Sequence, residues 1–173
     1  MRVIINKELL WFCLFFWFAF LLAGCAGKYA KKDYPTRTLI VPLGFESAYE
    51  NIQYSAAVKV GNTLIVSGVS GGDFGVTLED KARKAFLTIK RILEYAGSGL
   101  GDVVEIVTYH RNMTDFYRFA TVKSEFFKAN YPAWTAVGTA DLVNPDAEVE
   151  IKVTAIIDSG KNVRLQREWR AIK

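Results

Sequence analysis

Residues 54–70 read YSAAVKVGNTLIVSGVS, and this stretch predicts a β-hairpin. Two segments rich in β-branched residues, 54–60 and 63–69, flank the dipeptide Gly61-Asn62. A two-residue connection of this kind is typical of the tight turn between antiparallel strands, because glycine and asparagine tolerate a positive φ. The hairpin supplies the first two strands of the fold that we expect.

The residues after the hairpin predict a long amphipathic helix over 78–96. Thr77 and Asp80 stand three residues apart, in the arrangement of a weak capping box. Apolar residues then recur at helical spacing, with basic residues turned outward. The apolar stripe consists of Leu78, Ala82, Ala85, Phe86, Ile89, Ile92, Leu93 and Ala96. A glycine-rich segment over 97–101 ends the helix.

The second half of the domain alternates between strand and helix patterns. We expect a strand over 103–111, a helix over 115–130 and strands over 134–139 and 147–157. The last of these alternates strictly between apolar and polar residues. The order predicts an α+β fold in which both helices pack on one face of a sheet. The other face mixes polar and apolar residues, so it is either solvated or half-buried against another subunit.

The amino-terminal region has the layout of a lipoprotein signal peptide. Arg2 and Lys7 precede an unbroken apolar run over residues 9–22, and small residues stand directly before Cys25. The run is shorter than the roughly 20 apolar residues that a membrane-spanning helix needs. We therefore expect export to a bacterial cell envelope, cleavage before Cys25 and membrane anchoring through lipid on that thiol. The alternative is an uncleaved anchor with an incidental cysteine.

Four segments follow from these patterns. Residues 1–24 form the lipoprotein signal peptide, 25–37 a small and basic tether, 38–158 the domain and 159–173 a basic carboxy-terminal tail. The tail carries Lys or Arg at every third position from Lys161 to Lys173, with apolar residues between them. It is either a solvated charged tail or a short helix that lies on the membrane surface.

Composition excludes several classes of function. The chain carries 22 Lys and Arg against 18 Asp and Glu, and no basic stripe is interleaved with aromatic residues, so we expect no nucleic acid as a partner. Cys13 lies in the predicted signal peptide and Cys25 is the predicted lipid site, which leaves no thiol for catalysis. Since His110 is the only histidine, a metal site of cysteine and histidine ligands is excluded as well.

Four stretches of the domain resemble the RidA (YjgF-like) family. They are the hairpin at 54–70, KARKAFLTIKRILEYAGSGLGDVVEIVTYHRNMTDF at 81–116, YPAW at 131–134 and VEIKVTAI at 149–156. The resemblance implies a chorismate-mutase-like α+β fold that assembles as a homotrimer, with clefts between neighbouring subunits. It also implies hydrolysis of reactive enamines and imines, such as 2-aminoacrylate, to a keto acid and ammonia without a cofactor.

The resemblance also assigns site residues. Glu150 falls on the catalytic glutamate that orients or activates the attacking water. Tyr54 and Ser67 fall on two residues of the family cleft. Thr135 is the small hydroxyl residue that follows the family's substrate-binding arginine.

The arginine that holds the substrate carboxylate in this family is replaced here. It follows a Pro-Ala pair in active deaminases, and Trp134 stands at that position. The asparagine usually found before the Asp-Phe step is Thr114. A guanidinium offers paired donors that match a carboxylate, whereas an indole offers one N–H and a broad apolar face. Losing the pair costs on the order of a few kcal/mol, or roughly a hundredfold in affinity, so we expect a less anion-seeking pocket.

Several residues admit two interpretations. Glu150 is either a water-activating group or a surface glutamate of an ordinary strand. Trp134 is either a stacking platform for a ligand or a filler of a degenerate cleft between subunits. Arg111 and, more weakly, Arg118 are candidates for a relocated guanidinium, and the alternative is that both are solvated. His110 is expected to be half-exposed at a strand end.

The functional hypothesis is a membrane-anchored RidA-like protein whose inter-subunit cleft binds a small metabolite, with residual enamine or imine deaminase activity. The alternative is a non-catalytic trimeric binding or scaffold module. Trp134 and the exported location favour the alternative, because the enamines that this family clears arise in the cytoplasm and decay quickly in water. A hydrolase of altered specificity in the same cleft is a third possibility, for which the sequence indicates no substrate.

Overall fold

The computed structural model describes residues 34–72 and 75–166, and the fold below is that of the unit that begins at Pro35. The predicted signal peptide, the lipid site at Cys25, most of the tether and the last seven residues of the tail lie outside the described residues. Within the described ranges, no helix is both long and apolar enough to cross a membrane.

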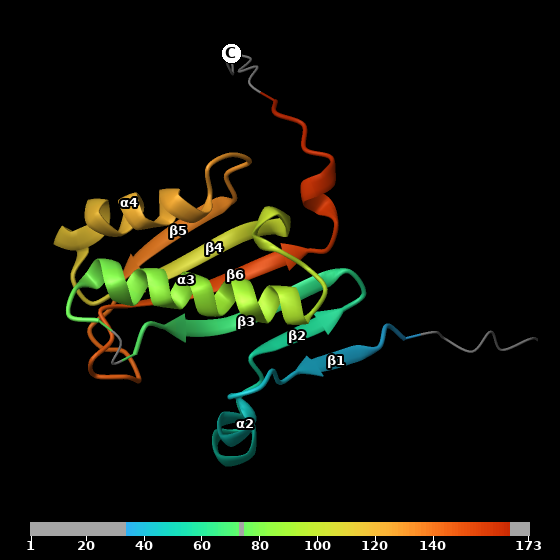
Figure 1. Cartoon of the computed structure of the whole chain (residues 1–173), viewed down its shortest axis with the longest axis horizontal. Coiled ribbons are helices and arrows are strands. Elements are labelled where there is room, and N and C mark those ends of the chain that lie inside the picture. Colours follow the sequence, from blue (N-terminus) through green and yellow to red (C-terminus); the bar gives the residue numbers. More distant parts are fainter. Residues whose placement is uncertain (1–33, 73–74, 167–173) are drawn as a thin grey trace, which may run out of the picture. The chain divides into compact units, whose positions relative to one another are not determined.

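Six strands form one mixed sheet in the order β1-β2-β3-β6-β4-β5 (Figure 1). All neighbours pair antiparallel except β4 and β5, which pair parallel. The strands are β1 Arg37–Ile40, β2 Ala57–Val60, β3 Thr63–Ser70, β4 Val103–His110, β5 Ala133–Gly138 and β6 Val149–Ile156. The helices are α2 Glu46–Ile52, α3 Leu78–Tyr95 and α4 Phe116–Phe126. The α+β fold with two helices packed on one face of the sheet is confirmed.

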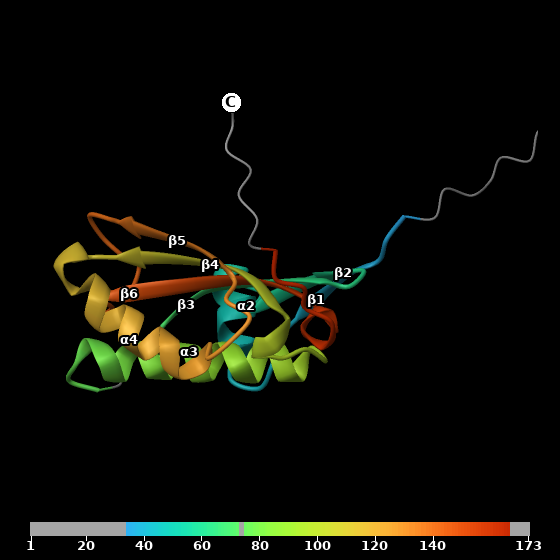
Figure 2. The same cartoon turned by 90° about the horizontal axis from the view of Figure 1, so that it is seen from above.

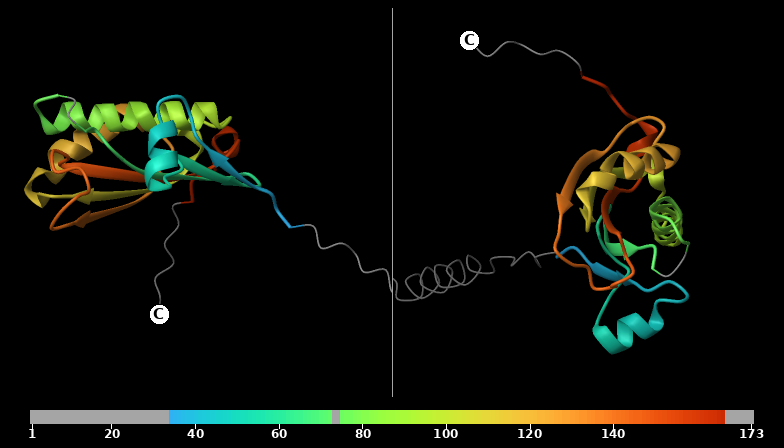
Figure 3. Two further views of the ribbon diagram at one scale, coloured as in Figure 1. Left: turned by 90° about the horizontal axis from the view of Figure 1, so that it is seen from below. Right: turned by 90° about the vertical axis from the view of Figure 1, so that its left-hand side faces the viewer.

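The helices α3 and α4 cover one face of the sheet and leave the opposite face without a helix (Figure 2). Two further views show α3 lying along the sheet, and α2 set apart from α3 and α4 (Figure 3). The apolar stripe of α3 is buried against the strands, with Phe86, Ile89 and Leu93 fully inaccessible to solvent. Phe86 also stacks on Phe126 of α4, with ring centroids 4.9 Å apart. Apolar burial of this kind supplies most of the stability of an amphipathic helix.

The turn of the predicted hairpin and the start of the first helix are confirmed, whereas β2 begins at Ala57 rather than at residue 54 and α3 ends at Tyr95 rather than at 96. Gly61 has a φ of +58° between β2 and β3, as the tight turn requires. Thr77 caps α3, because its Oγ1 accepts a hydrogen bond from the backbone N–H of Asp80 at 3.2 Å. Its hydroxyl donates in turn to the Asp80 carboxylate at 2.8 Å. The predicted side-chain cap by Thr77 is therefore confirmed, but Asp80 pairs with the Thr77 hydroxyl and not with the Thr77 backbone N–H that a full capping box uses.

The structure differs from the sequence prediction in three elements. β1 and α2 are additional, and β1 begins at Arg37, the last residue of the predicted tether. No residue of α2 is buried, so the segment carries no apolar periodicity that a pattern search would detect. α4 ends at Phe126 rather than at residue 130, because the backbone of Phe127 (φ −120°, ψ 81°) has already left the helical region.

His110 is buried rather than half-exposed. It ends β4 with only 1% of its surface accessible, on the helix-covered face. Its ring packs edge-on against Phe119, with centroids 4.9 Å apart, and its Nε2 lies 2.8 Å from Thr108 Oγ1. Burial lowers the pKa of His110 below its usual value, because the charged imidazolium would lose its hydration there.

His110 is expected to make the fold acid-sensitive between pH 7.5 and 5.5. A depressed pKa in the folded state means that the unfolded chain binds the proton more readily, so stability falls as the pH drops through the ordinary value near 6.5. The free energy of unfolding, measured by urea denaturation, should fall by about 1 kcal/mol more in the wild type than in His110→Leu over this window. Since His110 is the only histidine, equal losses in both proteins would contradict the prediction.

Candidate functional site

The candidate site lies where β3 bulges next to the amino-terminal end of β6. The register of the β3–β6 pair shifts between Val66 and Val69, which leaves Ser67 and Gly68 unpaired in the ladder. Ser67 donates a hydrogen bond from its hydroxyl to the carbonyl of Ser55 at 2.7 Å. The bulge is thereby held against the segment that leads into β2.

Gly68 gives Glu150 the space for its carboxylate. A Cβ at position 68 would lie 2.0 Å from Glu150 Oε1 and 2.6 Å from Glu150 Cδ. Any side chain at this position would therefore displace the carboxylate, so the close approach requires glycine. The glutamate itself alternates with the buried Val149 and Ile151, and it therefore projects from the helix-free face.

Tyr54 completes this group of residues. Its hydroxyl donates to the carbonyl of Gly68 at 2.8 Å, and its ring stacks on Phe45 at a centroid distance of 6.3 Å. Burial, and secondly the charge of Glu150, raise the pKa of Tyr54, while a hydrogen bond with Ser67 lowers it in part. The phenol therefore stays protonated next to the carboxylate at neutral pH, as a half-buried polar group beside an acid.

Three of the predicted site residues thus meet within one chain, and two do not join them. Tyr54, Ser67 and Glu150 surround the Gly68 bulge, as described above. Thr135 is exposed on the helix-free face of β5, where it pairs with Val107 of β4. Two strand spacings place it roughly 10 Å or more from the Glu150 backbone. Trp134, its neighbour in sequence, projects from the opposite face of the sheet.

Trp134 is packed against α4. Its indole stacks on Phe116 at a centroid distance of 5.0 Å and an interplanar angle of 13°. Lys123 Nζ lies 4.4 Å from the ring centroid, a cation–π contact. The indole N–H donates to Thr108 Oγ1 at 3.0 Å. These contacts occupy both the polar end and the apolar face of the side chain.

The two arginines considered as replacements are engaged elsewhere. The Arg111 guanidinium hydrogen-bonds the carbonyl of Pro145 and lies 3.7 Å from Asp141, so it fastens the loop between β5 and β6. Arg118 forms a paired interaction with Glu79, with both N–O distances at 2.8 Å, and so links α4 to α3. Neither guanidinium contacts the group around Glu150.

The sequence did not identify Gly68 and Phe45 as parts of the site. Gly68 carries a usable signal, because an isolated glycine within a strand pattern indicates a bulge or a close approach of another group. Phe45 carries none, since it precedes a short helix without a buried face. Among the residues that the structure describes, no group of three or more His, Cys, Asp or Glu is placed to hold a metal ion.

Comparison with known proteins supports the relationship that the motifs indicate. The family described as Endoribonuclease L-PSP matches residues 46–157. The 2-iminobutanoate/2-iminopropanoate deaminase of Dermatophagoides farinae is 36% identical over 111 residues, which cover 61% of this chain and 86% of that protein. The RutC family protein YjgH of Escherichia coli (strain K12) is 36% identical over 121 residues, 66% of this chain and 92% of its own.

A solved structure shows the same fold. The crystal structure of a member of the YjgF/YER057c/UK114 family from Mycobacterium tuberculosis aligns with a TM-score of 0.64 and 26% identity. The alignment covers 70% of this chain and 100% of that one. A chain made of this fold alone therefore exists. With the family match over more than half of its length, the present chain belongs to the Endoribonuclease L-PSP family, the RidA/YjgF family of its motifs.

Proposed function

We propose that this protein is a membrane-anchored RidA-like trimer whose inter-subunit clefts bind a small metabolite, and that Glu150 supports a residual imine deaminase activity. The relative from Dermatophagoides farinae is named as such a deaminase. In this reaction water adds to the C=N carbon, the C–N bond breaks, and the products are a keto acid and ammonia. The protein needs only to position the water and to handle its proton.

The arrangement of Tyr54 and Glu150 around Gly68 carries this proposal. A carboxylate on an open sheet face accepts hydrogen bonds from a water and can take its proton. Gly68 leaves room for the carboxylate beside the bulge, and the Tyr54 hydroxyl fixes the bulge itself by a hydrogen bond of 2.8 Å to the Gly68 carbonyl.

The helix-free face supports assembly with further copies. It exposes apolar side chains from four strands, namely Leu39, Ile65, Val137 and Ile156. Half-buried residues lie between them on the same face, among them Val58 and Val107. Polar residues such as Lys152 and Thr154 lie between these apolar groups, and a mixed face of this kind is suited to cover by another subunit. Glu150 lies on this face, so a cleft at its border would place the carboxylate between subunits.

Deaminase activity is tested by ammonia release from 2-aminoacrylate, with residues 26–173 as the protein. This fragment is adequate, because a relative made of this fold alone has been solved. We expect a low rate above buffer that falls at least about tenfold in Glu150→Gln, because the amide cannot accept a proton from water. Glu105→Gln is the matched control, since Glu105 lies on the same face but contacts Thr154. Equal rates in all three proteins would refute the role of Glu150.

A non-catalytic binding or scaffold module is the second candidate function. The packing of Trp134 favours it, because the indole is held within the chain by Phe116, Lys123 and Thr108. No guanidinium occupies the position that holds the substrate carboxylate in the family resemblance. Without that charge, a cleft retains little preference for small keto or imino acids.

Replacing Trp134 by arginine should destabilise the domain. The change removes the stack on Phe116 and brings a second cation next to Lys123. We expect the free energy of unfolding, from urea denaturation at pH 7, to fall by about 2–4 kcal/mol. Trp134→Phe keeps an aromatic stack and loses the bond to Thr108 and part of the ring contact area, so it should cost less, about 1 kcal/mol. A Trp134→Arg protein as stable as the wild type would show that the indole is not a packing residue.

Membrane anchoring is tested by the two cysteines of the full chain. In bacteria fed an alkyne-tagged fatty acid, the wild type should carry the tag and sediment with membranes. Cys25→Ser should lose the tag, because the thiol is the predicted acceptor. Cys13→Ser should keep it, since that residue lies in the predicted signal peptide. A tagged Cys25→Ser protein, or a membrane-bound protein whose mass includes Met1, would contradict lipidation.

A further inference from the structure

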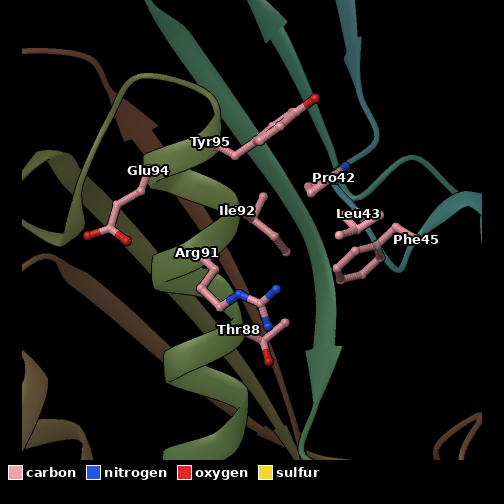
Figure 4. A pocket seen from close by; sticks show the side chains of 8 residues that line it. All are labelled: Pro42, Leu43, Phe45, Thr88, Arg91, Ile92, Glu94 and Tyr95. Carbon is pink, nitrogen blue, oxygen red and sulfur yellow. The ribbon is translucent and has the colours of Figure 1, made fainter.

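A cavity of about 330 Å³ lies between the second half of α3 and the turn that follows β1 (Figure 4). Phe45 is its one lining residue that also touches the group around Glu150, through the stack on Tyr54. The lining residues are Pro42, Leu43 and Phe45 from the turn, and Thr88, Arg91, Ile92, Glu94 and Tyr95 from α3. A volume of this size is at the lower end of the range found for small-molecule sites.

The turn that forms one wall of the cavity is fixed by its own geometry. The backbone N–H of Phe45 donates to the carbonyl of Pro42 at 3.0 Å, and Gly44 between them has a φ of +93°. A positive φ at the third position is what a type II turn requires. The stack of Phe45 on Tyr54 holds the aromatic ring from behind. The wall is therefore in place before any ligand arrives.

The cavity is apolar inside and carries one cation. Ile92 is buried, while Phe45 borders the space from the turn and Tyr95 from the helix (Figure 4). The Arg91 guanidinium extends beside Thr88 toward Phe45, whereas Glu94 points away from the turn (Figure 4). Glu94 forms an ion pair with Lys90, whose Nζ lies 2.5 Å from its carboxylate.

Arg91 is available for a ligand. Among the residues that the structure describes, no carboxylate forms an ion pair with it. The nearby acid of α2, Glu46, accepts a hydrogen bond from the backbone N–H of Gly44 at 2.7 Å. A planar guanidinium at the mouth of an apolar space matches a carboxylate bidentately.

We propose that this cavity is a binding site for a small aromatic carboxylate. The ring of the ligand packs among Phe45, Ile92 and Tyr95, and its carboxylate pairs with Arg91, with the Thr88 hydroxyl as an additional donor. A body of about ten heavy atoms fits the volume, and aromatic walls favour a planar ring over a polar ligand. The site meets the one around Glu150 only at Phe45, whose ring stacks on Tyr54, and it does not depend on the proposed function.

The test is titration calorimetry of residues 26–173 with 3-phenylpropanoate. For about eleven heavy atoms in an open cavity we expect a dissociation constant of about 1 mM or lower. The neutral 3-phenylpropan-1-ol and acetate should each bind at least about tenfold more weakly. The alcohol lacks the carboxylate that pairs with Arg91, and acetate lacks the aromatic ring. No binding of 3-phenylpropanoate up to about 10 mM, or equal binding of the alcohol, would overturn the proposal.

Variants locate the binding within the chain. Arg91→Gln should weaken binding by about tenfold or more. Arg91→Lys should weaken it by less, because lysine keeps the positive charge but lacks the paired N–H donors of the guanidinium. Tyr95→Ser should weaken it about threefold, and the fold should survive, since 65% of this side chain is exposed. Circular dichroism checks that each variant is folded.

Two control variants separate this cavity from other sites. Lys128→Gln removes a cation on the loop before β5 that does not line this cavity, and Glu150→Gln alters the candidate catalytic site. Both should bind 3-phenylpropanoate like the wild type. If Glu150→Gln changes the affinity and Arg91→Gln does not, the ligand lies in the candidate site, and the proposal is wrong.

Discussion

The pairing of β6 between β3 and β4 is the interaction on which the rest of the domain depends. β1 to β3 form one half of the sheet and β4 and β5 the other, and only β6 joins them. It is the last strand in the sequence, so the sheet closes only when almost the whole domain has been made. Its apolar residues Val149, Ile151 and Val153 are buried under the helices. The central place of this strand also decides where Glu150 lies.

On the helix-covered face of the sheet, aromatic side chains pack around Thr108. This buried residue accepts a hydrogen bond from the indole of Trp134 and lies 2.8 Å from the ring nitrogen of His110. Both rings contact aromatic residues of α4. The side-chain polar atoms of these residues therefore have hydrogen-bond partners within the chain, and no ligand is required to satisfy them. Trp134 is partly buried and packs against the core at this end of the sheet.

Segments with a clear hydrophobic periodicity predict most of this fold, whereas the elements that the sequence analysis missed lie in segments without such a periodicity. The stripe of α3, the Gly61-Asn62 turn and the alternation in β6 each combine local preference with burial, so pattern and structure agree. The half-exposed position expected for His110 is wrong, because His110 shares a buried strand face with Ile106 and Thr108. β1 and α2 contribute one buried residue, Ile40, and so leave no periodic signal. For the same reason the wall that Phe45 provides could not be predicted.

The alternation of side chains between the two faces of the sheet also limits which residues a single copy of this chain can bring to one ligand. Trp134 and Glu150 project from opposite faces of one sheet, so no ligand can touch both within one subunit. A cleft that used the two positions together would have to take them from two copies, with the sheet edge at β5 close to the bulge of a neighbour. Among the residues that the structure describes, no strand pairs with the outer edge of β5, which leaves that edge open for such a contact. In such a cleft Trp134 would add no charge, and selectivity would rest on Glu150, Tyr54 and the shape of the space between subunits.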